Sequence, residues 1–394
     1  MSIKKTLVAV IAALVMLAGA VAQGFPAYLK MDGTVIKGYD EDDIPDNLVI
    51  PEGVTEIGAE AFKYCLYLES VEIPASVRKI GDKAFEGCTS LVRVSLTEGL
   101  TEIGRNAFAA CKVLADITIP TSVKEIGGGA LQVCESLKSI VIPDGVTAVG
   151  IGMFNHCLAL SSVTIPASVT VIEDGAFRNC AALESIAIPD GVTEIGKQTF
   201  EGSGIKEITI PDSVTKIGTH AFNNCKSLTR AVLPSNLSEI SERLFEDCAS
   251  LVDITIPAGV TKIGFLAFSR SGLKEITISR GVKEIAQSAF SECNSLESAV
   301  IPRGVTKLNG TFSNCESLKR VSIPRSVTSI SYAFDYCPKL RDVDYDGTKA
   351  QWRAVDENSW IHRESGLSNA TIHCTDGKLK YDVDPWNWEL VDTD

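Results

Sequence analysis

The feature that most constrains this chain is a repeat of 22 or 23 residues that returns about thirteen times. One copy, residues 160–182, reads LSSVTIPASVTVIEDGAFRNCAA. Its phenylalanine recurs at positions 62, 85, 108, 154, 177, 200, 222, 245, 268, 290, 312 and 334, with Leu131 in the remaining copy. A period of this length is typical of stacked arrays, in which each unit buries its apolar side only against its neighbours. The sequence therefore predicts a solenoid.

One copy of the repeat can be interpreted residue by residue. From Ser162 to Ile165 polar and apolar side chains alternate, which is the period of a half-buried strand, and Pro166 ends that strand. Val169 and Ile172 indicate a second, shorter extended segment, and residues 176–180 are long enough only for a helical turn. We expect a β-rich α/β fold, a single solenoid with a concave parallel sheet and short helical turns on the return side.

The recurrent pattern I-P-x-x-V-T-x-I-G-x-x-A-F-x-x-C-x-x-L-x-x-I resembles the BspA-like, or Treponema-type, leucine-rich repeat. Residues 73–94 show it clearly, and the resemblance covers about residues 50–345. Departures are local, since Leu131 replaces the phenylalanine and Ser203 and Ser271 replace the cysteine. The resemblance implies a leucine-rich-repeat fold and adhesion to host or matrix proteins and to partner bacteria.

The ends of the chain differ from the repeats. Residues 1–22 combine a basic start, an apolar run and a small-residue A-V-A site, which predicts a cleaved signal peptide; an uncleaved anchor is the alternative. We expect an N-terminal cap at 23–49, the repeats at 50–343, a C-terminal cap at 344–377 and an acidic, tryptophan-containing tail at 378–394. The packing of that tail stays open. The mature chain is expected to have no transmembrane segment and to be secreted, periplasmic or at the cell surface.

The net charge argues against two classes of partner. The chain carries a formal charge of −13, with a sequence pI near 4.9. A field of this sign repels nucleic acid and anionic membranes, and the sequence has no basic stripe to offset it. We therefore expect no nucleic-acid partner.

The twelve cysteines do not follow the pattern of a disulfide framework. Eleven of them lie three residues after the phenylalanine of their repeat, so they are expected to form a column in the stack. Side chains at equivalent positions of adjacent coils point in parallel, which does not suit the geometry of a disulfide. The sequence predicts buried, reduced thiols.

Catalytic and metal-binding patterns are weak. The chain has four histidines, and none accompanies a recognisable nucleophile motif. His362, His373, Cys374 and Asp376 lie close together in the sequence, but their spacing is not that of a zinc site. No glycine-rich phosphate loop is present. We expect no catalytic residue, no bound metal and no cofactor, and hence a protein that is not an enzyme.

The remaining candidate site is the outward face of the predicted concave sheet. Its middle coils carry small, uncharged residues, and charged residues flank them. The candidate protein-binding residues are Ser139, Val141, Ser162, Thr164, Ser185, Ala187, Glu207, Thr209 and Arg230. Such a face could accept a broad protein partner, or its serine, threonine and valine residues could simply suit an exposed β surface. The sequence leaves both interpretations open.

These observations favour a non-catalytic, adhesin-like module that binds extracellular or surface proteins of a host matrix or of neighbouring cells. The alternative is an envelope scaffold without a specific host ligand. A carbohydrate-binding function is disfavoured, because the outward columns of the predicted sheet contain no aromatic residue.

Overall fold

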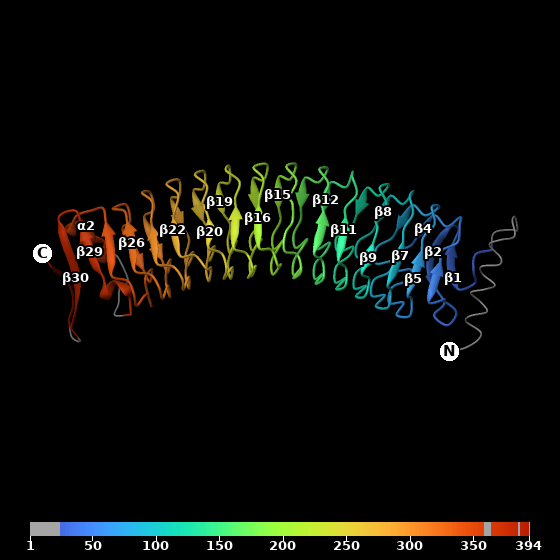
Figure 1. Cartoon of the computed structure of the whole chain (residues 1–394), viewed down its shortest axis with the longest axis horizontal. Helices are drawn as coiled ribbons and strands as arrows, with labels where there is room; N and C mark the ends of the chain where they lie inside the picture. Colours follow the sequence, from blue (N-terminus) through green and yellow to red (C-terminus); the bar gives the residue numbers. More distant parts are fainter. Residues whose placement is uncertain (1–23, 358–363, 385–386, 394) are drawn as a thin grey trace. The chain divides into compact units, whose positions relative to one another are not determined.

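The computed structural model describes residues 24–357, 364–384 and 387–393, so the predicted signal peptide at 1–22 lies outside the described residues. Contacts divide the chain into two compact units. The first unit runs to Thr170 and includes Ala176–Leu183, and the second consists of Val171–Gly175 and the chain from Glu184 onward. Both units are β-rich stacks of parallel coils with very little helix (Figure 1). The predicted solenoid fold is confirmed.

Each coil contributes a strand to the side that we call the strand side. In the first unit these strands are β3 (Asn47–Val49), β5 (Ser70–Glu72), β7 (Arg93–Ser95), β9 (Asp116–Ile117), β11 (Ser139–Val141) and β13 (Ser162–Thr164). In the second unit they are β16 (Glu207–Thr209), β18 (Arg230–Val232), β20 (Asp253–Ile254), β22 (Glu275–Thr277), β24 (Ser298–Val300), β26 (Arg320–Ile323) and β28 (Asp342–Tyr345).

A second, shorter strand follows the proline corner of most coils. In the first unit this series comprises β4 (Glu56–Ile57), β6 (Lys79–Ile80), β8 (Glu102–Ile103), β10 (Glu125–Ile126) and β12 (Ala148–Val149). In the second unit it comprises β14 (Val171–Ile172), β15 (Glu194–Ile195), β17 (Lys216–Ile217), β19 (Glu239–Ile240), β21 (Lys262–Ile263), β23 (Glu284–Ile285), β25 (Lys307–Asn309) and β27 (Ser329–Ser331).

Each strand pairs in parallel with the equivalent strand of the next repeat. Ser70 pairs with Arg93 and Val71 with Val94, so equivalent residues stack directly. Val71 and Val94 are buried, whereas Arg93 is exposed. The alternation that the sequence predicts is therefore present in most strands, with one face in the core and the other outside, although the outward Ser70 of β5 is buried.

The opposite side of each coil, which we call the return side, holds the phenylalanine column. The rings of Phe62 and Phe85 stack with centroids 5.2 Å apart in the first unit, and those of Phe222 and Phe245 lie 5.5 Å apart in the second. All four side chains are fully buried. Leu131 is buried at the equivalent position, so the apolar column continues where the aromatic stacking stops.

The return-side backbone forms turns rather than regular helix. Residues two positions before and after the phenylalanine are left-handed, as at Glu60 (φ 60°) and Tyr64 (φ 56°) around Phe62. The N–H groups of these three residues donate to carbonyls of the next coil at 2.7–2.9 Å. A right-handed helical turn would direct these groups along its own axis. Alternating handedness directs them to the neighbouring coil and so joins the stack, which offsets the cost of the left-handed residues.

Each end of the array has additional structure. At the N-terminal end, β1 (Leu29–Asp32) pairs antiparallel with β2 (Val35–Tyr39). At the C-terminal end, α2 (Lys349–Glu357) and the 3₁₀ turn Gly366–Asn369 precede β29 (Thr371–Cys374), β30 (Gly377–Asp384) and β31 (Asn387–Asp392).

The C-terminal strands extend the sheet of the last coils. β29 pairs parallel to β28, and β30 and β31 add to it as antiparallel strands. The described part of the tail, which the sequence left undecided, therefore packs on the cap. Trp352 is fully buried against the Tyr345 ring, as expected of a core residue.

Candidate functional site

In the first unit, the predicted site residues of β11 and β13 lie side by side on the outward face. Ser139 pairs with Ser162 and Val141 with Thr164, and all four side chains are exposed. Val141 exposes 63% of its surface, which is the largest value among the exposed valines of the described chain. This part of the face is small and uncharged, as the sequence predicted.

In the second unit, the predicted site residues of β16 and β18 form a charged part of the face. Glu207 pairs in register with Arg230, and all three of Glu207, Thr209 and Arg230 are exposed. The Arg230 guanidinium contacts the Asp253 carboxylate at 3.0 Å. Charge here is supplied by residues that change from coil to coil.

Ser185 and Ala187 are exposed, but they do not lie in a strand, contrary to the strand that the periodicity predicts. In several other coils, the N–H after the strand donates to the next coil, as at Ile210 to the Val232 carbonyl (3.0 Å), although the N–H groups of Leu96, Ile119 and Leu233 make no such bond among the described residues. Within the described residues, Ile188 makes no such bond to Thr209. The N–H of Lys206 still donates to the Glu184 carbonyl at 3.0 Å, but the ladder does not continue beyond it. We call this gap between residues 184–188 and β16 the open seam.

A shallow hollow of 400 Å³ lies at the open seam. It is lined by Ile186, Ala187, Ile188, Asp190, Glu207, Ile208, Thr209 and Pro211. Ile186 occupies the inward position of its coil, yet it is only half-buried, whereas the equivalent Ile208 exposes 3% of its surface. The gap in the ladder therefore gives solvent access to a side chain that the repeat normally hides.

Sequence reasoning missed Ile186 and Asp190 as site residues, although a feature of the sequence points to them. The next coil is one residue short, with 22 residues from Phe200 to Phe222, and Ser203 replaces its cysteine. The deletion shortens the path from the return side to β16, while the return-side bonds stay in register. It is not required for a break, because β9 and β11 also belong to different sheets across a step of 23 residues.

A second coil in the same unit shows the same association. The step from Phe268 to Phe290 is also 22 residues, and Ser271 again replaces the cysteine just before β22. Here β20 ends one sheet and β22 begins another. The inward Ile254 of β20 is half-buried, like Ile186. A short return loop that carries serine thus accompanies two of the breaks in the ladder, whereas the break between β9 and β11 occurs at a step of 23 residues.

Most of the cations on the second unit's outward face are neutralised within the protein. The Arg320 guanidinium contacts the Asp344 carboxylate, and the Arg230 guanidinium contacts the Asp253 carboxylate at 3.0 Å. Among the described residues, Glu207 and Glu275 have no ion-pair partner. The outward face therefore presents uncompensated negative charge.

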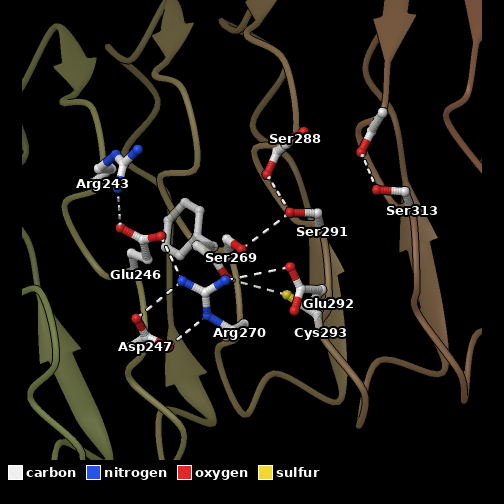
Figure 2. Close-up of polar contacts among 12 residues, drawn as sticks. Arg243, Glu246, Asp247, Ser269, Arg270, Ser288, Ser291, Glu292, Cys293 and Ser313 are labelled. Carbon is white, nitrogen blue, oxygen red and sulfur yellow. Dashed lines mark hydrogen bonds and ion pairs between the residues drawn. The ribbon is translucent and has the colours of Figure 1, made fainter.

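A charged cluster lies on the return side of the same unit (Figure 2). The Glu246 side chain is 4% exposed, and it accepts bonds from Arg270 at 2.8 Å and from Arg243 at 3.2 Å. Arg270 also contacts Asp247 at 2.6 Å and Glu292 at 3.3 Å. Because the arginines hold these carboxylates in ion pairs, the cluster is suited to stabilising the coils rather than to proton transfer.

The cysteines are free thiols, and the eleven of the column are buried. Each thiol from Cys88 onward donates to a carbonyl of the preceding coil, as Cys88 does to Phe62 at 3.2 Å and Cys157 to Leu131 at 3.1 Å. Burial raises the pKa of Cys157 to about 12. The predicted thiol column is confirmed, and such thiols are poor nucleophiles near neutral pH.

The histidines and acids of the C-terminal cap do not assemble a metal centre in the described chain. Over residues 24–357, 364–384 and 387–393, no group of three His, Cys, Asp or Glu side chains could hold an ion. His373 is engaged by Asp342, and His362 lies outside the described residues.

Within the described ranges, no helix combines the length and apolar character that crossing a bilayer requires.

The chain matches the family model described as the BspA type leucine rich repeat region over residues 45–160, 149–272 and 240–354. It is 31% identical to a leucine rich cell surface protein of Faecalibacterium prausnitzii, with a TM-score of 0.51 and coverage of 87% of this chain and 100% of that one. A leucine-rich repeat protein of Bacteroides ovatus is 26% identical, with a TM-score of 0.58 and coverage of 83% and 100%. The pneumococcal vaccine antigen PcpA, at 17% identity and a TM-score of 0.53 over 86% and 96% of the two chains, shares the fold. A comparison with curated proteins finds no match.

Proposed function

Because this chain belongs to the BspA-type leucine-rich repeat family, we propose that it is an exported protein that binds other proteins through the outward faces of its strand sides. The partners are surface or matrix proteins of a host or of neighbouring cells, which makes the function adhesin-like. The resemblance to a bacterial cell surface protein at 31% identity supports a location outside the cytoplasm.

One observation supports the proposal: positions that hold the same residue in most repeats are buried, and positions whose residue varies between repeats are exposed. The phenylalanine, cysteine and inward strand positions are almost all buried. The outward positions change from Ser162 and Thr164 in the first unit to Glu207 and Arg230 in the second, and all four are exposed. A regular backbone with an adaptable surface is the arrangement that solenoid proteins use to bind partners.

A non-catalytic function agrees with the chemistry of the described residues. A leucine-rich-repeat solenoid is typically non-catalytic, and the buried thiols and the arginine-paired carboxylates are poorly placed to attack a substrate. An extended face can instead supply the area of about 800 Å² per partner that stable protein complexes bury.

The test is binding of the mature chain to immobilised matrix proteins. Replacing both Ser162 and Thr164 with arginine should weaken saturable binding without lowering the melting temperature, because both side chains are exposed. The matched control places two arginines at Leu158 and Ala181, which are exposed at equivalent positions of two successive coils of the same unit.

Each outcome of this test has a defined meaning. Equal binding by the Ser162→Arg/Thr164→Arg variant and the wild type would place the site away from this face. If the wild-type chain binds no matrix or surface protein at all, the adhesin-like function is wrong and an envelope scaffold is favoured.

A further inference from the structure

The backbone groups at the open seam are unpaired among the described residues, as they also are after Ile119 and Leu233, but the hollow at the open seam is lined by carboxylates and no cation, whereas the hollow at β18 and β20 includes Arg230. In the closed coils, the carbonyls of one strand accept N–H groups from the preceding coil, as Val232 accepts from Ile210 at 3.0 Å. By the same pattern, the Glu207 and Thr209 carbonyls and the Ile188 N–H face the open seam. Among the described residues, no backbone bond between Ile188 and Thr209 closes it.

The side chains around the open seam combine an apolar floor with an acidic rim. Ile186 and Ile208 belong to the floor of the hollow, and Asp190 and Glu207 are exposed carboxylates beside it. No lysine, arginine or histidine lines the hollow. The nearest cation in sequence, Lys206, contacts the Glu184 carboxylate at 2.7 Å.

We propose that the open seam binds a lysine or arginine side chain presented by an extended segment of the partner protein. The aliphatic stem of that side chain lies against Ile186 and Ile208, which covers the exposed part of Ile186. Its charged end lies between the Asp190 and Glu207 carboxylates and forms ion pairs with them, and no proton is transferred. The unpaired carbonyls of β16 serve as additional acceptors, since a cationic side chain is a donor only. This inference rests on the protein-binding function proposed above and specifies the chemistry of its partner.

Other occupants fit the hollow less well. An anionic group would meet two carboxylates, because the neighbouring Arg230 guanidinium does not line the hollow and is held by Asp253 at 3.0 Å, so the group would be repelled. An aliphatic side chain alone would cover Ile186 but would also cover the backbone groups of the seam without bonding to them, which is unfavourable. The hollow of 400 Å³ is shallow and suits one side chain rather than a whole small molecule.

The experiment uses the mature chain and short capped peptides as probes. The peptides are acetylated and amidated and have the sequence Thr-Val-Xaa-Val-Thr, in which Xaa is lysine, arginine, norleucine or glutamate. Binding is followed through the methyl resonances of the isoleucines and by titration to a dissociation constant. We expect the lysine and arginine peptides to shift the Ile186 and Ile188 resonances, and we expect the norleucine peptide to bind about fivefold more weakly.

Two matched variants assign the charge effect to the open seam. Glu207→Gln should lower the affinity for the lysine peptide about fivefold, as expected for the loss of one exposed ion pair. Glu275→Gln removes the same charge from the equivalent position in β22, outside the hollow, and should leave affinity unchanged. Because both side chains are exposed, neither variant should alter the melting temperature.

Several results would overturn the inference. These are absence of any shift at Ile186 and Ile188, equal affinity for the lysine and norleucine peptides, and equal losses in Glu207→Gln and Glu275→Gln. Retention of surface proteins that is unaffected by Glu207→Gln would leave the proposed function standing and remove only this site. Specific peptide binding without retention of any surface protein would support this site and contradict the proposed function.

Discussion

The two sides of a coil differ in how regularly they continue from one repeat to the next. In the coil after Phe200, the return side stays in register: the Phe200 N–H donates to the Ala221 carbonyl at 2.8 Å, and the Phe200 and Phe222 rings lie 5.3 Å apart. The strand side of the same coil loses its ladder to residues 184–188. The return side therefore fixes the spacing of the coils, and the strand side absorbs the irregularity.

The difference follows from how many contacts tie each side together. On the return side, most coils contribute a stacked ring, three backbone bonds and a thiol that donates to the preceding coil, as Cys225 does to Phe200 at 3.0 Å. On the strand side, a strand of two or three residues supplies only its ladder bonds. The side with fewer constraints is free to vary, and it is the side to which we assign binding.

The comparison predicts that the largest loss of stability comes from the return side. Phe245→Ala removes a fully buried ring that stacks on Phe222 and Phe268 at 5.5 Å on either side. We expect the free energy of unfolding of the second unit to fall by about 4 kcal/mol, measured by urea denaturation. Val232→Ala on the outward face should change it by less than about 0.5 kcal/mol. Similar losses in the two variants would contradict the comparison.

The return-side charge cluster should give the next largest effect. Arg270→Ala leaves the buried Glu246 with Arg243 and Asn223 as its remaining partners. We expect a loss of about 2 kcal/mol in the free energy of unfolding, because an inadequately compensated buried charge is unfavourable. The control is Lys206→Ala, which breaks an exposed pair with Glu184 and should cost less than about 0.5 kcal/mol.

Alkaline pH should weaken the return side through its thiols. Burial raises the pKa of Cys157 to about 12 from an ordinary value of 9.0. The neutral thiol is therefore fully compatible with folding below about pH 9, and stability is lost as the pH rises from about 9 toward 12. Each such thiol contributes a decline of about 1.4 kcal/mol per pH unit. Urea denaturation of wild type and Cys157→Ser over this range should show a shallower decline in the variant; parallel curves would show that this thiol does not contribute.

The open seam should appear in amide exchange without any change in global stability. The N–H of Ile210 donates to Val232 and that of Ile278 to Val300, whereas those of Ile188 and Ile256 make no such bond among the described residues. We expect hydrogen–deuterium exchange at Ile188 and Ile256 to be faster than at Ile210 and Ile278. Adding one residue after Ser203 should restore the usual repeat length and slow exchange at Ile188. Equal protection at all four amides would show that the seam is closed in solution.

Much of the fold was predictable because the same sequence pattern recurs in about thirteen copies. The alternation around Val163 and the constant Phe177 and Cys180 were sufficient to predict the strand, the buried ring column and the reduced thiols. Equivalent residues of stacked coils must lie side by side, so spacing in the sequence becomes position in space. The outward positions of the candidate site, such as Ser162 and Thr164, follow from the same rule.

Only the tertiary structure decided where this rule fails. Periodicity placed Ser185 and Ala187 in a strand and Ile186 in the core, whereas in the structure residues 184–188 form no ladder with β16 and Ile186 is only half-buried. It also predicted a helical turn on the return side, where alternating handedness instead directs N–H groups to the next coil. The physical reason is the same in both cases. A local pattern specifies which side chains are buried. The hydrogen bonds between coils determine the backbone conformation of each turn and which side of the coil loses its pairing.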